Sequence, residues 1–378
     1  MTSRPSRSHR ARAAAPGRRR QRRPRRAAAA LAAAVCAAAL LSSCAAPRTA
    51  AGSGEDAVDF TGCVLGSSGG FRDRSFIQDI HDSSRMLEDS LGIEVRTEES
   101  GSPRESEQLL KEMADPAGGC DLVVAMGSTL VEQVEAAAER HPDQDFAIID
   151  DDSIDLPNVR TLVFDASQPG FLAGYAAASA TETGRVGAVG GEDIPEVHDF
   201  LDGYAAGIEH WNEVHDDDVQ LIGWDPRERT GDFVGDFARM EVAAELTRRQ
   251  LDDGADVIMP VAGRAGLGAT ETIAQDDDAL VVWVDMDGWE VLPDEQRTRQ
   301  LTSVRKEVGS AVADVMTQYA TPGAEADDYT GTLANRGVAL GDFHGQAQRV
   351  DEQTAQELRQ LRQQIIEGRQ PIRPGAGT

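Results

Sequence analysis

Beyond residue 57, short apolar runs alternate with amphipathic segments along most of the chain. Apolar runs of this length are typical of strands buried on both faces of a sheet, and amphipathic segments are typical of helices that cover it. Strands and helices in alternation predict parallel sheets, so the expected fold class is α/β. We expect strands at 58–65, 92–97, 122–125, 146–149, 159–164, 186–189, 219–222, 257–261, 280–284 and 301–304, and helices at 105–113, 130–140, 200–211, 236–251 and 308–319.

The length of this region predicts two lobes, because about 320 residues exceed what a single core usually organises. Each half begins with an apolar strand and a glycine-containing loop, at 66–70 and at 190–191. Two doubly wound lobes would face each other with their strand-end loops across one cleft, as in a hinged clamp. We expect lobe 1 at 57–165 with part of 303–378, and lobe 2 at 166–302. The segment 331–378 should hold a small strand pair and then a polar helix at 353–367 that covers an edge.

The N-terminal region has the pattern of an export signal. Its first 26 residues contain eleven arginines and no acidic residue, and residues 27–41 are uncharged and apolar. The apolar run is short for a membrane span, so residues 1–43 are interpreted as a cleaved signal peptide. The sequence LSSC that ends at Cys44 resembles a bacterial lipobox, which predicts lipidation of Cys44 and a flexible tether at 44–56. The alternative is an ordinary secretory signal with an incidental cysteine.

Charge excludes one class of partner. The whole chain has 37 − 65 = −28 formal charges, and without the eleven arginines of the signal the remainder has 26 − 65 = −39. Nucleic acid is a poor partner for such a surface, because phosphate binding requires clustered Lys and Arg. The acidic runs at 150–152, 216–218 and 276–278 lack the spacing of a calcium loop, so no metal or cofactor is expected.

Two cysteines remain outside the signal and the proposed lipidation site, namely Cys63 and Cys120. Exported proteins meet an oxidising compartment, where such a pair can join. Cys63 lies in the first strand and Cys120 precedes the third, and first and third strands are commonly neighbours in a doubly wound lobe. We therefore predict a disulfide, with two buried free thiols as the alternative.

Seven short motifs lie in order along the chain. They are GFRDRSF at 70–76, AIID at 147–150, FLAG at 171–174, GYAAG at 203–207, GADVI at 254–258, VD at 284–285 and TSVRK at 302–306. In this order and spacing they resemble the basic membrane protein family, the purine-nucleoside-binding lipoproteins of ABC importers. The resemblance extends from about Asp59 to about Tyr319 and implies a type I periplasmic-binding-protein-like clamp. It also implies a small-molecule ligand, permease and ATPase partners, and a position on the extracytoplasmic face of the cell membrane, held by the lipid anchor.

The resemblance assigns two aromatic residues to the ligand ring. Phe76 and Phe233 match the family pair that encloses the purine, and stacking on aromatic rings tolerates any flat base. The alternative is that both are ordinary core phenylalanines. Asp150 matches a strand-end acid that meets the base edge; a solvated loop acid is the alternative.

The resemblance places three further residues at the sugar. Asp285 ends an apolar run, where its carboxylate would accept hydrogen bonds from two vicinal hydroxyls. Lys306 offers three donors, and it is one of only two lysines in the chain. A surface charge is the alternative for Lys306. Gly263 has no Cβ, so a hydroxyl can approach the main chain there.

Three positions depart from the family pattern. The family usually has Asp where Ser67 stands, Asn where Ile77 stands and Glu where Gln168 stands. We keep Ser67 and Gln168 as candidate ligand contacts, and these changes bear on the identity of the ligand.

No catalytic residues are assigned. The chain has no His-x-x-x-His pair, no CxxC pair and no phosphate loop, and its seven histidines are scattered. A binding protein is therefore favoured over an exported hydrolase. A second alternative is a ligand-sensing lipoprotein that signals to a membrane receptor, since the clamp also occurs in regulatory proteins.

Overall fold

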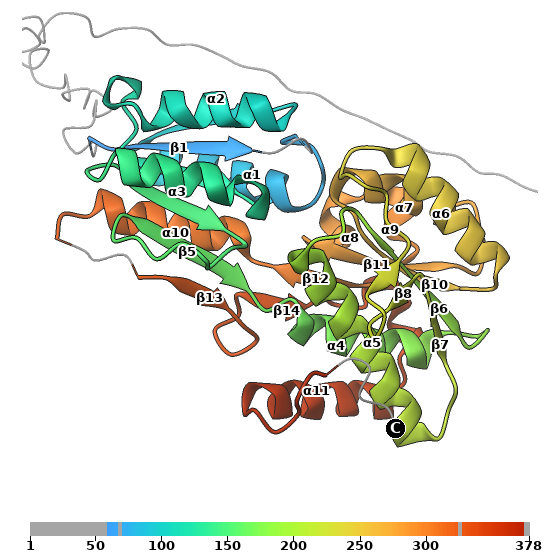
Figure 1. The fold of residues 1–378 in the computed structure, drawn as a ribbon. Coiled ribbons are helices and arrows are strands. Elements are labelled where there is room, and N and C mark those ends of the chain that lie inside the picture. The colour runs from blue at the N-terminus through green and yellow to red at the C-terminus, as the bar shows by residue number, and fades with distance from the viewer. Residues whose placement is uncertain (1–58, 67–69, 324–326, 374–378) are drawn as a thin grey trace, which may run out of the picture. The chain divides into compact units, whose positions relative to one another are not determined.

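The computed structural model describes residues 59–66, 70–323 and 327–373 (Figure 1). These residues belong to one compact unit that begins at residue 56. The segments predicted as signal peptide and tether, together with Cys44 and Ser67, lie outside the described residues. Within the described ranges, no helix is long and apolar enough to cross a membrane.

Two six-stranded sheets form the framework of the molecule, one in each lobe. The first has the order β13-β5-β4-β3-β1-β2 and the second the order β14-β12-β11-β10-β6-β7. All neighbours are parallel except β12 and β14. The α/β prediction of two parallel-sheet lobes is confirmed. The strands are β1 Thr61–Gly66, β2 Glu94–Glu99, β3 Leu122–Met126, β4 Asp145–Ile149, β5 Val159–Phe164, β6 Arg185–Gly190, β7 Gln220–Ile222, β10 Val257–Val261, β11 Leu280–Asp285, β12 Gln300–Lys306, β13 Tyr329–Gly331 and β14 Val338–Leu340, with a separate hairpin of β8 Trp224–Asp225 and β9 Thr230–Gly231.

Helices cover both sheets, as Figure 1 shows. The central strands are buried along their whole length, as β3 and β10 illustrate. Their continuous apolar runs are the signal that identified them in the sequence. The helices are α1 Phe76–Leu91, α2 Pro103–Ala114, α3 Val131–Arg140, α4 Ser167–Ala180, α5 Pro195–His215, α6 Met240–Asp252, α7 Gly266–Ile273, α8 Gly288–Val291, α9 Asp294–Arg297, α10 Val308–Ala320 and α11 Glu352–Ile366.

Helices α4 and α5 pack with their backbones in close approach. A Cβ on Gly174 would lie 2.0 Å from the carbonyl oxygen of Tyr204, and one on Gly207 would lie 2.0 Å from that of Phe171. No residue larger than glycine fits at either position without moving a helix. The glycines of the FLAG and GYAAG motifs thus serve helix packing, not the cleft.

The chain passes between the sheets three times. It does so between β5 and α4, between β12 and α10, and between β13 and β14. The expectation of a small strand pair after residue 331 was wrong: β13 extends the first sheet beside β5, whereas β14 extends the second beside β12. The final helix α11 packs on α4, where Glu357 accepts a hydrogen bond from the hydroxyl of Tyr175 at 2.8 Å.

Cys63 and Cys120 are joined in the structure, with their Cα atoms 5.7 Å apart. The strands β1 and β3 are neighbours, and Cys63 is in register with Val123, three residues beyond Cys120. The two cysteines come together because β1 and β3 are adjacent strands of the sheet.

Candidate ligand-binding site

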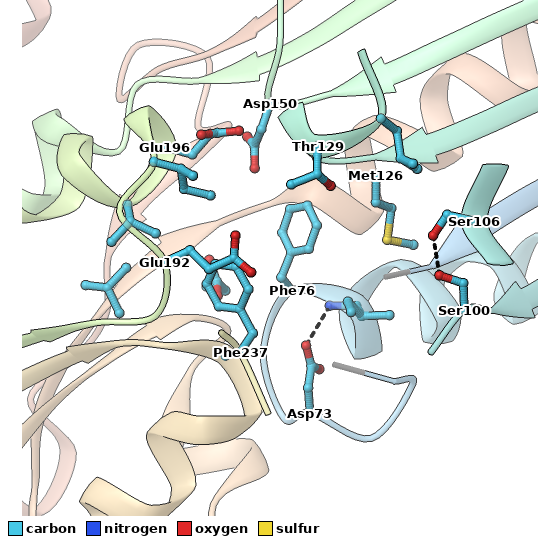
Figure 2. Close-up of a pocket in the computed structure, with 18 of the residues that line it drawn as sticks. Asp73, Phe76, Ser100, Ser106, Met126, Thr129, Asp150, Glu192, Glu196 and Phe237 are labelled. Atoms are coloured by element: carbon cyan, nitrogen blue, oxygen red, sulfur yellow. Dashed lines mark hydrogen bonds between the residues drawn. The ribbon is translucent and has the colours of Figure 1, made fainter. Parts of the chain in front are cut away.

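A cavity of about 350 Å³ lies at the carboxyl ends of the strands, with lining residues from both lobes (Figure 2). Lobe 1 contributes residues at or after the ends of β1, β2, β3 and β4, and lobe 2 contributes residues at or after the ends of β6, β10, β11 and β12. This is the place where open parallel sheets bind ligands. Five of the expected site residues line it: Phe76, Asp150, Gly263, Asp285 and Lys306.

Lys306 and Asp150 form a buried ion pair between the lobes. The Nζ atom lies 2.7 Å from both carboxylate oxygens, and the side chains are 4% and 11% exposed. Lys306 is the last residue of β12, and Asp150 follows β4 with a φ of 63°. The ammonium also lies 5.0 Å from the ring centre of Phe76 and 5.8 Å from that of Phe200. Its charge is therefore compensated by a carboxylate and by aromatic faces.

Asp285 ends β11 in the left-handed region, with a φ of 64°. Its carboxylate accepts a hydrogen bond from the hydroxyl of Ser75, which belongs to the other lobe. Burial raises the pKa of Asp285 to about 6, although the nearby Lys306 and the Ser75 hydrogen bond act in the opposite direction. Burial therefore outweighs these partners, so additional hydrogen-bond donors would stabilise the ionised form of the carboxylate.

The start of α1 is organised by Asp73, which the sequence reasoning missed as a site residue. Its buried carboxylate accepts hydrogen bonds at 3.0 Å from the backbone N–H groups of Ser75, Ile77 and Gln78. These bonds satisfy donors that a helix leaves free at its N-terminus. Burial nevertheless raises the pKa of Asp73. The carboxylate thereby positions Phe76, the first residue of the helix, in the cavity.

Phe233, which the sequence assigns to the ligand ring together with Phe76, does not line the cavity, whereas Phe237 does. Phe233 forms a bridge with Gly190 and packs edge-on against Trp224, with ring centres 5.9 Å apart. The following turn returns the chain to the cavity, where Phe237 lies so close to Gly191 that a Cβ there would be 2.4 Å from the ring. In Figure 2, Phe76 and Phe237 lie at the same cavity from opposite lobes.

Gln168 is not a lining residue either. Its Oε1 accepts a hydrogen bond from the backbone N–H of Leu333 at 2.8 Å, and its Nε2 donates to Asp165 at 2.7 Å. It thus joins the first and third crossings between the lobes. Gly263 does line the cavity, with a φ of 50° and with space beside the Phe237 side chain. Ile77 lines it as well and is buried.

The cavity is acidic, which sequence reasoning did not predict. Among the described lining residues, five carboxylates accompany one lysine. The position of Glu192 could have indicated a carboxylate at the cavity, because this residue directly follows the strand-end glycines 190 and 191. Within the described ranges, no group of three or more His, Cys, Asp or Glu residues is arranged to hold a metal ion. The lining carboxylates are Asp73, Asp150, Glu192, Glu196 and Asp285.

The family model for PnrA-like ABC transporter substrate-binding proteins, the Bmp family, matches residues 61–373. The chain belongs to this family. The resemblance to basic membrane proteins is thereby confirmed, and a Bmp protein is the substrate-binding component of an ABC transporter, not an enzyme. The family implies a small-molecule ligand, permease and ATPase partners, and an extracytoplasmic site of action.

Relatives with assigned names agree with the family. Basic membrane protein A of Borreliella burgdorferi is 28% identical over 270 residues, covering 70% of this chain and 74% of that protein. The ABC transporter nucleoside-binding protein BmpA of Lactococcus lactis is 26% identical over 319 residues, covering 79% and 86%. Both alignments include most of this Bmp chain.

Solved structures support the fold. An ABC transporter solute-binding protein from Aeropyrum pernix superposes with a TM-score of 0.74 and 23% identity, covering 84% of this chain and 94% of that chain. One from Conexibacter woesei superposes with a TM-score of 0.63 and 21% identity, covering 83% and 99%. The Bmp chain therefore has the type I periplasmic-binding-protein-like fold.

Proposed function

We propose that this protein captures a purine nucleoside outside the cytoplasmic membrane and delivers it to the permease of an ABC importer. One observation carries the proposal: Phe76 from lobe 1 and Phe237 from lobe 2 line the same cavity as Asp285 and Lys306. A ring and a sugar thus have separate partners within one site. The name of the Lactococcus lactis relative, a nucleoside-binding protein, agrees with this assignment.

The aromatic side chains support a flat ligand. Stacking of a base on an aromatic side chain contributes about 1–3 kcal/mol and does not depend on the pattern of hydrogen-bond donors. With one phenylalanine in each lobe, a ring between them would bring the lobes together. The cavity volume of about 350 Å³ falls in the range of small-molecule sites, roughly 300–1,000 Å³.

The polar end of the cavity supports a sugar with free hydroxyls. Asp285 has two acceptor oxygens, and Ser75 donates to only one of them. Vicinal hydroxyls could occupy the other oxygen and replace Ser75. Lys306 has three N–H donors, and two of its hydrogen bonds go to the carboxylate oxygens of Asp150. One donor is thus left for a sugar hydroxyl. Gly263 leaves the main chain open to a hydroxyl on the same side.

The charge of the cavity supports a nucleoside over a nucleotide. Five lining carboxylates and one lysine produce a negative potential in a partly enclosed space. A phosphate group carries negative charge and would be repelled there, and the lysine is already paired with Asp150. A free 5′-hydroxyl meets no such barrier.

The N-terminal anchor is part of the proposal. A lipid on Cys44 would hold the folded unit beside its permease, with residues 45–56 as the tether. The test is metabolic labelling with a fatty acid in the native host. The wild-type protein should take up label, and Cys44→Ala should take up none. Label on Cys44→Ala, or no label on the wild type, would contradict the anchor.

Calorimetry tests the ligand. Purified protein without the signal region should be unfolded and refolded to remove co-purified ligand, and then titrated with adenosine, guanosine, inosine, adenine, ribose and adenosine 5′-monophosphate. We expect one purine nucleoside per chain, with the free base, free sugar and nucleotide at least about tenfold weaker. No heat with any nucleoside, from protein with a cooperative thermal transition, would reject the nucleoside assignment.

A further inference from the structure

Glu192 is a carboxylate at the cavity that the proposed nucleoside contacts do not use. It follows β6 and the two glycines 190 and 191, and it lines the cavity (Figure 2). Gly191 lies against the ring of Phe237, and Glu192 is the next residue in the chain. Glu192 therefore lies beside the proposed stacking position. Among the described residues, no hydrogen-bond donor or cation is paired with the Glu192 carboxylate.

Three other lining carboxylates have hydrogen-bond or ion-pair partners within the protein. Asp73 accepts from backbone N–H groups at the start of α1, Asp150 binds Lys306, and Asp285 accepts from Ser75. Burial raises the pKa of Glu192, and the negative charges of Asp236 and Glu196 raise it further.

A partly buried carboxylate among like charges is unfavourable until a donor or a cation reaches it. The protein supplies neither among its described residues, and the open side of Glu192 is the cavity. The missing partner is therefore expected on the ligand. Because the cavity holds five carboxylates and one lysine, a ligand cation would improve its charge balance, whereas a neutral donor would leave the excess negative charge unchanged.

We propose that Glu192 selects nucleosides that carry a protonated amine, through an ion pair between its carboxylate and the ligand ammonium. This inference rests on the proposed nucleoside function and names a class of substrate within it. A charge-assisted hydrogen bond of this kind is stronger than a neutral one. The remaining contacts of the ring and the sugar stay as proposed above.

Matched pairs of ligands test the proposal. The first pair is 5′-amino-5′-deoxyadenosine and adenosine, and the second is N6-(2-aminoethyl)adenosine and N6-propyladenosine. Within each pair the shape is nearly equal and only one member is cationic at neutral pH. We expect the cationic member of at least one pair to bind about tenfold more tightly to the wild-type protein, and the favoured pair locates the ammonium.

Two variants assign the effect to the residue. Glu192→Gln keeps the shape and removes the charge, so it should abolish the preference for the cationic member and leave the neutral member within about threefold. Glu245→Gln makes the same change of net charge on the exposed face of α6, away from the cavity, and should retain the preference.

Either of two results would overturn the proposal. One is equal affinity of both members in both pairs for the wild-type protein. The other is a preference that survives Glu192→Gln or disappears equally in Glu245→Gln. Binding of adenosine separates the proposed role of Glu192 from the proposed nucleoside function. If adenosine binds and the cationic ligands bind no more tightly than their neutral partners, only the role of Glu192 fails. If no member of either pair binds to folded protein, the nucleoside function fails.

Discussion

Lys306 of lobe 2 and Asp150 of lobe 1 meet across the cleft, with the Nζ atom 2.7 Å from both carboxylate oxygens and both side chains largely buried. The two residues lie 156 positions apart in the chain. Each stands at the end of a strand, and the facing of the two sheets brings them together. The pair thus couples the lobes at the cavity itself.

Removal of this lysine should destabilise the free protein. Lys306→Met leaves Asp150 buried without a counter-ion, which typically costs about 3–5 kcal/mol in the free energy of unfolding. Urea denaturation of the variant and the wild type measures this loss in the free energy of unfolding. Lys111→Met is the matched control, because Lys111 and Glu107 form an exposed pair that solvent screens, so its loss should change the stability little. Adding Asp150→Asn to Lys306→Met should recover part of the loss. A Lys306→Met protein as stable as the control would contradict the buried pair.

Phe237 and Phe233 should respond differently to truncation. Phe237→Ala removes a ring from the cavity, so we expect every purine ligand to bind at least tenfold more weakly, with little change in stability. Phe233→Ala removes a ring that packs on Trp224, so we expect a loss of at least about 2 kcal/mol of stability with affinity within about threefold of wild type. Calorimetry and thermal unfolding on both variants separate these effects. The reverse pattern would restore Phe233 as the ligand contact.

Asp285 should recognise the sugar. Asp285→Ala is expected to weaken adenosine about tenfold or more, because it removes an acceptor from the ribose hydroxyls. It should affect 2′,3′-dideoxyadenosine much less, since that ligand has no vicinal hydroxyls. The two proteins and two ligands form a double cycle, measured by calorimetry, in which errors common to both ligands cancel. Equal weakening of both ligands would contradict the sugar-binding role.

The same residue predicts a pH dependence in the absence of ligand. The pKa of Asp285 is raised to about 6 in the folded protein, above its ordinary value of 3.8, so the folded state holds this proton more tightly than the unfolded state. Between these two values the stability of the wild type should therefore decrease as pH rises. Asp285→Asn has no proton to lose there. The difference in unfolding free energy between wild type and Asp285→Asn should favour the wild type more at pH 4.5 than at pH 7. A difference that is constant with pH would show that the pKa is not raised.

The pairing of Cys63 with Cys120 should be found in the exported protein. Mass spectrometry without reduction should detect one peptide pair linked through these residues, which are 57 positions apart. Replacing both by serine should cost about 2–5 kcal/mol of stability under oxidising conditions. Under reducing conditions the wild type and the double variant should become nearly equal. Alkylation of both thiols in the unreduced protein would contradict the bond.

Local pattern was sufficient for much of the fold. The central strands could be located because their continuous apolar runs follow from burial on both faces. The helices between them indicated parallel sheets. The family resemblance, together with the rule that ligands bind at strand ends, then assigned Asp150, Asp285 and Lys306 to one cleft. The fold inferences use residues close together in the sequence, and the site inferences use the short motifs that the family shares.

The tertiary structure decided what depends on pairing between distant segments. Phe233 forms a bridge with Gly190 and does not line the cavity, whereas Phe237, four positions later, does. Both residues belong to one short polar segment, and its pattern does not say which strand it will meet.

Gln168 and the last two strands show the same limit. Gln168 binds Leu333, which is 165 positions away, and β13 and β14 extend different sheets although only six residues separate them. The sequence by itself determined which residues end strands and which helices cover them, because those properties depend on local hydrophobic period. Which side chains share the cavity was decided only when two sheets came face to face, because hydrogen-bond partners and burial are properties of the assembled lobes and not of any single segment.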